Sequence, residues 1–394
     1  AVLVFLFAPK TPMVVLIFAA VMGVTFLSTV PPTAGLVASG TSGVLCSVLN
    51  SGTQALTYNN SVPGGSATAV NESLAFNYSW TCDSASRNLA GNGVPNHVVA
   101  GGNFATRVSA QAVSGSVTLS PEAKASSTAV KLPGFALNSV KMDPATAGTC
   151  TNTASSVTSG CNYAGGNGAW RMEAMGDPAV SPWKFDFGTD ENNAHVQPNG
   201  QYHYHGMPYG LLKRLQYDKK MSLVGWAADG YPIYAQFAYK KPSDPKSGLV
   251  KLKSSYKLRS GDRTEGPSGP FDGSFNSDFE YNKRFGDLDE HNGRTGVTPE
   301  YPKGTYYYVL TDTFPFVPRS FKGVPDRSFF RMPPGGGPGG VRGAGGAPGA
   351  PAGPPVSAKA SSKFVTIVRG RTVYIYSADG LKLLETRQLP PDNQ

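Results

Sequence analysis

The sequence predicts an all-β protein: a sandwich- or barrel-like domain with long loops and one short helix, followed by a small C-terminal β segment. Only 15% of the 394 residues are charged, whereas about 25% is typical of soluble domains. The chain contains 47 Gly and 32 Pro, and its 18 Tyr and 20 Phe lie among Val, Thr and Ser, which favour strands and turns. Runs of residues with a helical period are scarce, which argues against a helical bundle or a coiled coil.

The N-terminal region predicts export. Residues 13–30 form an almost uninterrupted apolar segment, preceded by Lys10 and followed by small and turn-forming residues. This order is typical of a secretory signal peptide. The apolar segment also has about the minimum length that spans a bilayer, so an uncleaved membrane anchor is the alternative. Both interpretations assign residues 1–40 to a signal peptide or anchor and predict a secreted or cell-surface protein.

The four cysteines agree with export. They form no CxxC pair, which disfavours a zinc knuckle and leaves disulfide bonds as the default in an oxidising compartment. Chain order suggests one disulfide between Cys46 and Cys82 and another between Cys150 and Cys161, although three connectivities are open.

Three glycosylation sequons also fit an exported protein. They begin at Asn59, Asn71 and Asn77, in a segment rich in Ser, Asn and Thr. In a eukaryotic exported protein these asparagines would be glycan acceptors. A segment of this composition also produces such sequons by chance, so they agree with export without establishing it.

Residues 41–332 have the composition of one globular β domain. A short helix is expected over residues 209–219, where Leu211, Leu212 and Leu215 would share one face. Alternating apolar segments separated by turn sequences predict strands elsewhere in the domain. The clearest of these segments are residues 113–119, 223–227, 232–238 and 305–311. Short strands at this spacing are typical of a sandwich or a barrel.

The C-terminal region divides into a linker and a tail. Residues 333–360 are rich in Gly and Pro but lack the strict glycine period of collagen, which predicts a flexible linker. Residues 361–394 contain alternating apolar segments around Gly370 and Gly380, which predict two or three short strands. Because two strands alone are only marginally stable, this β tail is expected to pack against this chain or another one.

Charge and motifs argue against several common functions. The net charge is +9, from 35 basic and 26 acidic residues, and the basic residues never form a run of five. Nucleic acid is therefore a poor candidate partner. The chain lacks GxSxG, HExxH, Walker and dinucleotide-binding motifs in a suitable context, which disfavours ordinary hydrolase and nucleotide chemistry.

Three of the five histidines lie within residues 195–205. His203 and His205 would point to the same side of an extended strand, because side chains alternate between its two faces. Residues 198–200, Pro-Asn-Gly, can form a three-residue hairpin loop with Gly at the position that favours positive φ. In that register His195 lies opposite His203, and three imidazoles converge on one face.

The predicted convergence depends on the register of the hairpin. In the three-residue loop, Gln197 pairs with Gln201 at the end of the strands. A two-residue loop would instead place His195 opposite Tyr204 and move the histidines out of phase. The alternative to a shared site is a half-buried strand whose histidine and tyrosine tips form ordinary hydrogen bonds.

Three neutral imidazoles with open coordination positions are a common ligand set for catalytic zinc, and imidazole also suits copper, nickel and iron. The sequence therefore predicts a transition-metal site with zinc or copper as the cofactor. His97, in a turn-rich segment, is a candidate fourth ligand. Asn193 would lie opposite His205, and Glu191 follows two residues further along, so either could complete or orient the ligand set.

The tetrapeptide YHYH at residues 202–205, with its surroundings, resembles the YHYH domain family that is named for it. The resemblance extends over residues 90–325 and implies an exported protein, with no particular reaction. The segments that carry it are residues 92–97, 192–206, 225–234 and 287–323. Asp229 and Tyr234 would line the same site, although Asp229 with Gly230 also predicts a hairpin turn.

We therefore expect a secreted or surface-anchored protein with a histidine-rich transition-metal site on a β-hairpin. Whether it is an enzyme stays open, with Glu191 and Asp229 as candidate acid or base groups. The alternative is a non-catalytic extracellular structural or assembly protein, a homo-oligomer whose C-terminal strands contact neighbouring subunits. A carbohydrate-binding domain is a third interpretation, which rests on aromatic content alone.

Overall fold

The computed structural model describes residues 46–330, except 62–65, 125–127, 130–131, 145, 156–158, 163–165 and 177–187, and four strands between residues 356 and 388. The expected signal peptide or anchor lies outside the described residues. Among the residues that are described, no helix is long and apolar enough to cross a membrane. The chain divides into two compact units, residues 1–338 and 339–394.

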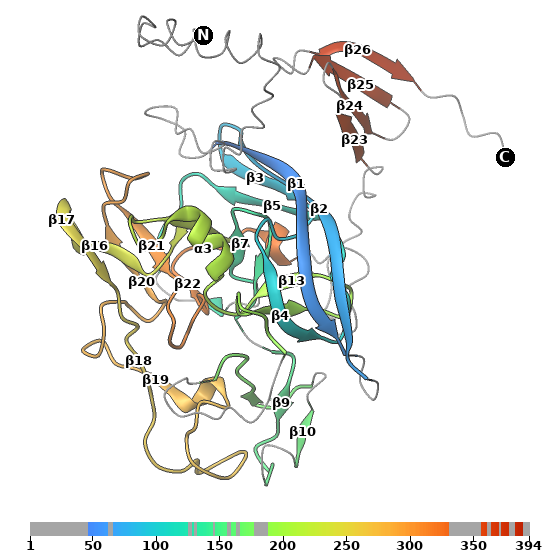
Figure 1. Cartoon of the computed structure of the whole chain (residues 1–394). Coiled ribbons are helices and arrows are strands. Elements are labelled where there is room, and N and C mark those ends of the chain that lie inside the picture. The colour runs from blue at the N-terminus through green and yellow to red at the C-terminus, as the bar shows by residue number, and fades with distance from the viewer. Residues whose placement is uncertain are drawn as a thin grey trace, which may run out of the picture. The chain divides into compact units, whose positions relative to one another are not determined.

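A five-stranded sheet opens the first unit (Figure 1), with strand order β4-β1-β2-β3-β5. The long antiparallel hairpin of β1 and β2 alternates buried and exposed residues, because one face covers the core. Strand β4 runs parallel to β1, whereas β3 and β5 are antiparallel to their neighbours. The strands are β1 (Ser47–Asn60), β2 (Thr68–Cys82), β3 (Ser86–Gly91), β4 (Val99–Phe104) and β5 (Val113–Thr118).

An eight-stranded mixed sheet forms the second layer, with strand order β12-β13-β8-β7-β14-β15-β21-β20. Parallel pairs join β13 to β8 and β15 to β21, so segments far apart in sequence become neighbours. The strands are β7 (Gly134–Ala136), β8 (Lys141–Met142), β12 (Ala194–Val196), β13 (Tyr202–Tyr204), β14 (Leu223–Ala227), β15 (Pro232–Tyr234), β20 (Gly293–Gly296) and β21 (Thr305–Val309).

The two sheets bury their inner faces against each other. One hydrophobic cluster joins side chains of β1 and β2 to those of β12 and β13. A second cluster surrounds Trp80 of β2 and Trp226 of β14, both fully buried. Large aromatic side chains contribute much of the buried apolar area in such a core. The prediction of an all-β, sandwich- or barrel-like domain is confirmed, with several sheets that include a curled half-barrel.

The predicted short helix is also confirmed, as α3 (Tyr209–Leu215). Leu211 and Leu212 are buried in the core, and Leu215 packs against it. The helix ends earlier than expected because Gln216 adopts a left-handed conformation with φ of 56°, and its amide donates to the last helical carbonyls.

Smaller strand pairs and two disulfides complete this unit. Cys46 is joined to Cys82 and Cys150 to Cys161, the pairing that chain order suggests. The remaining elements are β6 (Thr128–Ala129) with β22 (Ser320–Phe321), β9 (Thr149–Cys150) with β10 (Cys161–Asn162) and β11 (Trp170–Arg171), β16 (Phe237–Lys241) with β17 (Asp244–Lys251), β18 (Tyr256–Leu258) with β19 (Phe279–Tyr281), and the 3-10 turns η1 (Asn276–Asp278) and η2 (Arg327–Phe330).

The second unit contains a four-stranded antiparallel sheet. Its first strand lies inside residues 333–360, the range that composition predicts as linker. Residues 356–360 contain neither Gly nor Pro, so nothing in their composition prevents an extended strand. The strands are β23 (Val356–Ala360), β24 (Phe364–Arg369), β25 (Thr372–Ser377) and β26 (Leu383–Gln388).

Close backbone contact between β7 and β14 predicts a steric cost at Gly225. A Cβ atom there would overlap the carbonyl oxygen of Phe135 on the neighbouring strand. We expect Gly225→Ala to lower the free energy of unfolding by about 3 kcal/mol, because the backbone must move. The control is Gly248→Ala, where a Cβ meets nothing within 4 Å but φ is +76°. That conformation alone costs about 1 kcal/mol, and equal losses in chemical denaturation would contradict the prediction.

Candidate metal centre

The hairpin register that brings the histidines together is confirmed. Strands β12 and β13 are antiparallel, and His195 lies opposite His203. The Gln197 amide donates to the Gln201 carbonyl over 2.9 Å, which closes the three-residue loop. Gly200 has φ of 88°, the left-handed conformation that the loop requires.

Three imidazole rings converge on one face of this hairpin. The ring centroids of His195, His203 and His205 lie 4.6, 4.7 and 4.8 Å apart. One candidate ligand nitrogen from each ring lies within 4.8 Å of the others. The Nε2 atoms of His195 and His205 are 3.0 Å apart, close to the roughly 3.4 Å between two ligands of a tetrahedral zinc ion. The cluster can therefore hold a metal ion.

Of the two buried members of this triad, His203 is oriented by a hydrogen bond to the backbone. His203 and His205 are each 2% exposed, whereas His195 is partly exposed. Nδ1 of His203 lies 3.1 Å from the Gln201 carbonyl oxygen, so its N–H donates there and Nε2 carries the free lone pair. Nδ1 of His205 is buried beside the Asp143 backbone without a well-aligned hydrogen bond. This orientation suits metal ligation by two or three imidazoles.

Burial keeps the imidazoles of His203 and His205 neutral. It lowers the pKa values of His203 and His205 well below the usual range, and the nearby His195 and Lys141 lower them further. A neutral imidazole offers a lone pair to a metal, whereas a protonated one does not. The electrostatic environment therefore favours the ligating form at neutral pH.

Two paired cations lie near the triad. Lys141 is opposite His203 in the parallel pair of β8 and β13, and its Nζ is 3.1 Å from Asp143 Oδ2. Arg319, which also lowers the pKa of His205, is 2.7 Å from the carboxylate of buried Glu173. Each cation is paired with a carboxylate, so their repulsion toward a bound metal ion is largely offset.

The tyrosine side chains on the opposite face of β13 belong to a buried network of hydrogen bonds. The Tyr202 hydroxyl donates to Asp190 Oδ2 over 2.5 Å, and the Tyr204 hydroxyl donates to Nε2 of His97 over 2.6 Å. The Asn138 side chain donates to the Tyr204 oxygen over 2.9 Å. Every one of these side chains is buried, so the network satisfies polar groups inside the core.

His97 is consequently not a fourth ligand of the triad. Its Nε2 is engaged with the Tyr204 hydroxyl, and its Nδ1 lies 2.9 Å from the Val98 carbonyl oxygen. Residues adjacent along a strand point to opposite faces, so a partner of Tyr204 lies on the other side from His203 and His205. The prediction for His97 is wrong for this reason.

None of the predicted polar neighbours adds a ligand atom to the cluster, although Asn193 lies opposite His205 as the register predicts. Glu191 is exposed. The side chain of Asn193 donates to the Met207 carbonyl, while its own carbonyl accepts the His205 amide. Asp229 is buried in the turn between β14 and β15, where its carboxylate accepts a hydrogen bond from the Tyr308 hydroxyl. The hydroxyl of Tyr234 donates to Thr298 and Glu300, so it too lies apart from the triad.

Sequence reasoning missed the pairs Lys141 with Asp143 and Arg319 with Glu173. Lys141 approaches the triad only because β8 runs parallel to β13. Arg319 is more than a hundred residues beyond the hairpin in the sequence. No local pattern signals either contact, since both depend on pairings between distant segments.

The burial of His97 predicts a pH dependence of stability. Burial lowers its pKa from 6.5 to about 4. Between these values the unfolded chain binds a proton that the folded protein does not, so stability is complete above pH 6.5 and falls as the pH is lowered toward 4.

We expect this dependence to disappear in His97→Gln. The unfolding free energy of the wild type minus that of the variant should be constant above pH 7 and fall by about 1.4 kcal/mol per pH unit below pH 6.5. Urea denaturation of the metal-free wild type and of the metal-free variant between pH 5 and 8 measures this difference in unfolding free energy. A difference that does not change with pH would contradict the assignment of a buried neutral His97.

Comparison with known proteins gives one match. The model of the YHYH protein family matches residues 114–323, a range that includes the three triad histidines and excludes His97. No curated protein and no solved structure matches the chain. Because the matched range covers more than half of the sequence, the chain belongs to the YHYH protein family.

Proposed function

We propose that this protein is exported and binds a transition metal, zinc or copper, through His195, His203 and His205. The observation that carries the proposal is the convergence of three imidazoles whose candidate ligand atoms lie within 4.8 Å of one another. Zinc and copper both bind imidazole nitrogen well, and the cluster contains no carboxylate that would favour Mg²⁺, Ca²⁺ or Mn²⁺.

The triad supports a metal site with an accessible side. His203 and His205 are buried, but His195 is partly exposed. Three protein ligands leave at least one coordination position of a tetrahedral metal free, as in catalytic zinc sites. Bound zinc supplies Lewis acidity, and bound copper also supplies one-electron redox chemistry. A catalytic role is therefore a proposal that rests on metal binding.

Export is supported by two independent features. The two disulfides indicate an oxidising environment, because such bonds are rare in the reducing cytosol. The sequon residues Asn59, Asn71 and Asn77 are all exposed on β1 and β2, so each is accessible to glycosylation. We propose secretion or cell-surface attachment on this basis.

Assembly through the C-terminal sheet is a second candidate function. Strands β23 and β26 lie at the two edges of the four-stranded sheet. Edge strands carry backbone groups that can pair with a strand of another chain. Deletion of residues 356–394 should then abolish higher-order species in light scattering while metal content is retained. If the truncated protein forms the same higher-order species as the full-length protein, this role is contradicted.

We expect the purified wild-type protein to hold about one equivalent of zinc or copper. His203→Ala/His205→Ala should lose it, because only one triad imidazole remains. His97→Gln is the matched control: it also removes a buried histidine, but one on the other face of β13, and should keep the metal. Elemental mass spectrometry measures all three. Absence of metal from the wild type after incubation with both ions, or equal content in the double variant, would contradict the proposal.

A further inference from the structure

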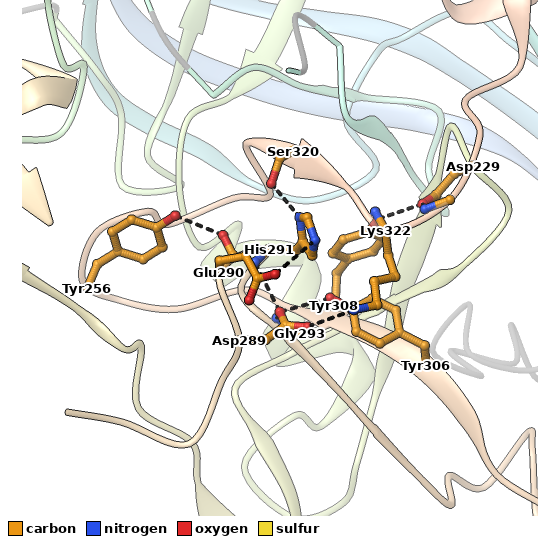
Figure 2. A network of polar contacts seen from close by, with 11 residues as sticks. Asp229, Tyr256, Asp289, Glu290, His291, Gly293, Tyr306, Tyr308, Ser320 and Lys322 are labelled. Carbon is orange, nitrogen blue, oxygen red and sulfur yellow. Dashed lines mark hydrogen bonds and ion pairs between the residues drawn. The ribbon is translucent and has the colours of Figure 1, made fainter. Parts of the chain in front are cut away.

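A second cluster of reactive side chains joins the turn before β20 to Ser320 of β22 (Figure 2). Nδ1 of His291 is 2.6 Å from the hydroxyl oxygen of Ser320. Nε2 of the same ring faces a carboxylate oxygen of Glu290 at 3.6 Å. Serine, histidine and carboxylate thus form one continuous chain of contacts, the arrangement that activates a serine hydroxyl as a nucleophile.

The loop that carries His291 is held in place by its own hydrogen bonds. Asp289 Oδ1 accepts the amides of His291 and Gly293 and the Tyr306 hydroxyl, each over 3.0 Å. The side chain of Asn292 donates to the Val309 carbonyl over 2.8 Å, and Asn292 has φ of 59°. These contacts position the imidazole before any substrate binds.

Ser320 is placed on the accessible side of its strand. Phe321 is fully buried, whereas Ser320 is partly exposed. Lys322, which follows the strand, lies near the same site, because its charge acts on the His291 imidazole. The Lys322 ammonium is 3.8 Å from Asp289 Oδ2, and its side chain is 31% exposed. The hydroxyl is therefore within reach of a solute, beside a fixed positive charge.

The environment of His291 favours the neutral imidazole, the form that a general base requires. Burial lowers the pKa of His291 and Lys322 lowers it further, whereas Asp289 and Glu290 raise it. Nδ1 accepts the Ser320 hydroxyl hydrogen when the ring is neutral, and the remaining ring proton then lies on Nε2, toward Glu290.

Two tyrosines also contact this loop. The Tyr256 hydroxyl donates to the Glu290 carbonyl, and the Tyr306 hydroxyl donates to Asp289. Burial raises the pKa of both, so neither changes charge near neutral pH. Within the described residues, the groups that set the charge around His291 are therefore Asp289, Glu290 and Lys322.

We propose that Ser320 and His291 form a nucleophilic centre that accepts the acyl group of a carboxylic ester, with Glu290 as a positioning residue. The Ser320 oxygen bonds to the ester carbonyl carbon while its proton moves to Nδ1 of His291. The bond to the alkoxy group then breaks, and that group leaves with this proton as an alcohol. Water, deprotonated by the same nitrogen, hydrolyses the acyl-serine and regenerates the hydroxyl.

This centre uses none of the triad residues, so its chemistry is independent of the proposed metal. Treatment of the full-length wild-type protein with an alkyl fluorophosphonate, followed by peptide mass spectrometry, should locate one adduct on Ser320. Labelling should persist in the presence of a chelator and in His203→Ala/His205→Ala. It should be absent from Ser320→Ala and unchanged in Ser247→Ala, which removes a serine that is partly exposed like Ser320 but whose hydroxyl contacts backbone carbonyls instead of a histidine.

The effect of His291 on the labelling rate shows whether Ser320 is activated by the imidazole or is merely accessible to the reagent. His291→Gln should slow labelling at least 100-fold, the usual contribution of a general base. In Glu290→Gln, a surface change, the midpoint of the rate against pH should move to lower pH, because the carboxylate that raises the pKa of His291 is gone. A merely structural role of Glu290 would leave this midpoint unchanged.

Several results would overturn the proposal. These are the absence of a Ser320 adduct under conditions that fully label a serine esterase, an adduct on a different serine, or wild-type labelling rates in His291→Gln. If near-ultraviolet circular dichroism shows that His291→Gln does not fold, Glu290→Gln decides the question. An unchanged pH midpoint in that variant would then reject the assigned centre.

Discussion

The strict two-residue periodicity of a β-strand, combined with a three-residue turn, is the constraint on which the candidate metal centre depends. Gly200 allows the turn, and the pairing of Gln197 with Gln201 sets the register. A shift by one residue would move His203 of β13 and the following His205 to the face that now carries Tyr202 and Tyr204. One glycine conformation therefore decides whether the three imidazoles meet.

The two faces of β13 serve different purposes. Tyr202 and Tyr204 face a network in which Asp190, His97 and Asn138 satisfy their hydroxyls. This fully hydrogen-bonded face anchors the strand in the core between the sheets. On the histidine face, the candidate ligand nitrogens of the three imidazoles lie within 4.8 Å of one another, which is the arrangement expected of a metal site.

Local patterns predicted much of this protein, and distant pairings account for what they missed. The strand at β14, the helix α3 and the register of His195 with His203 follow from periodicity and turn chemistry within about ten residues. The position of His97 could not be predicted, because it depends on which face of β13 the turn-rich segment covers. Lys141 and Arg319 reach the triad through tertiary contacts that leave no sequence signal.

The central claim is that the three hairpin imidazoles bind one metal ion together. X-ray absorption spectroscopy at the zinc or copper edge, on the purified metal-loaded protein, tests it most directly. The geometry predicts three imidazole nitrogens at about 2.0 Å, visible by their ring multiple scattering, plus a further light atom. Fewer than three imidazoles, or a spectrum unchanged by His203→Ala/His205→Ala, would contradict the account.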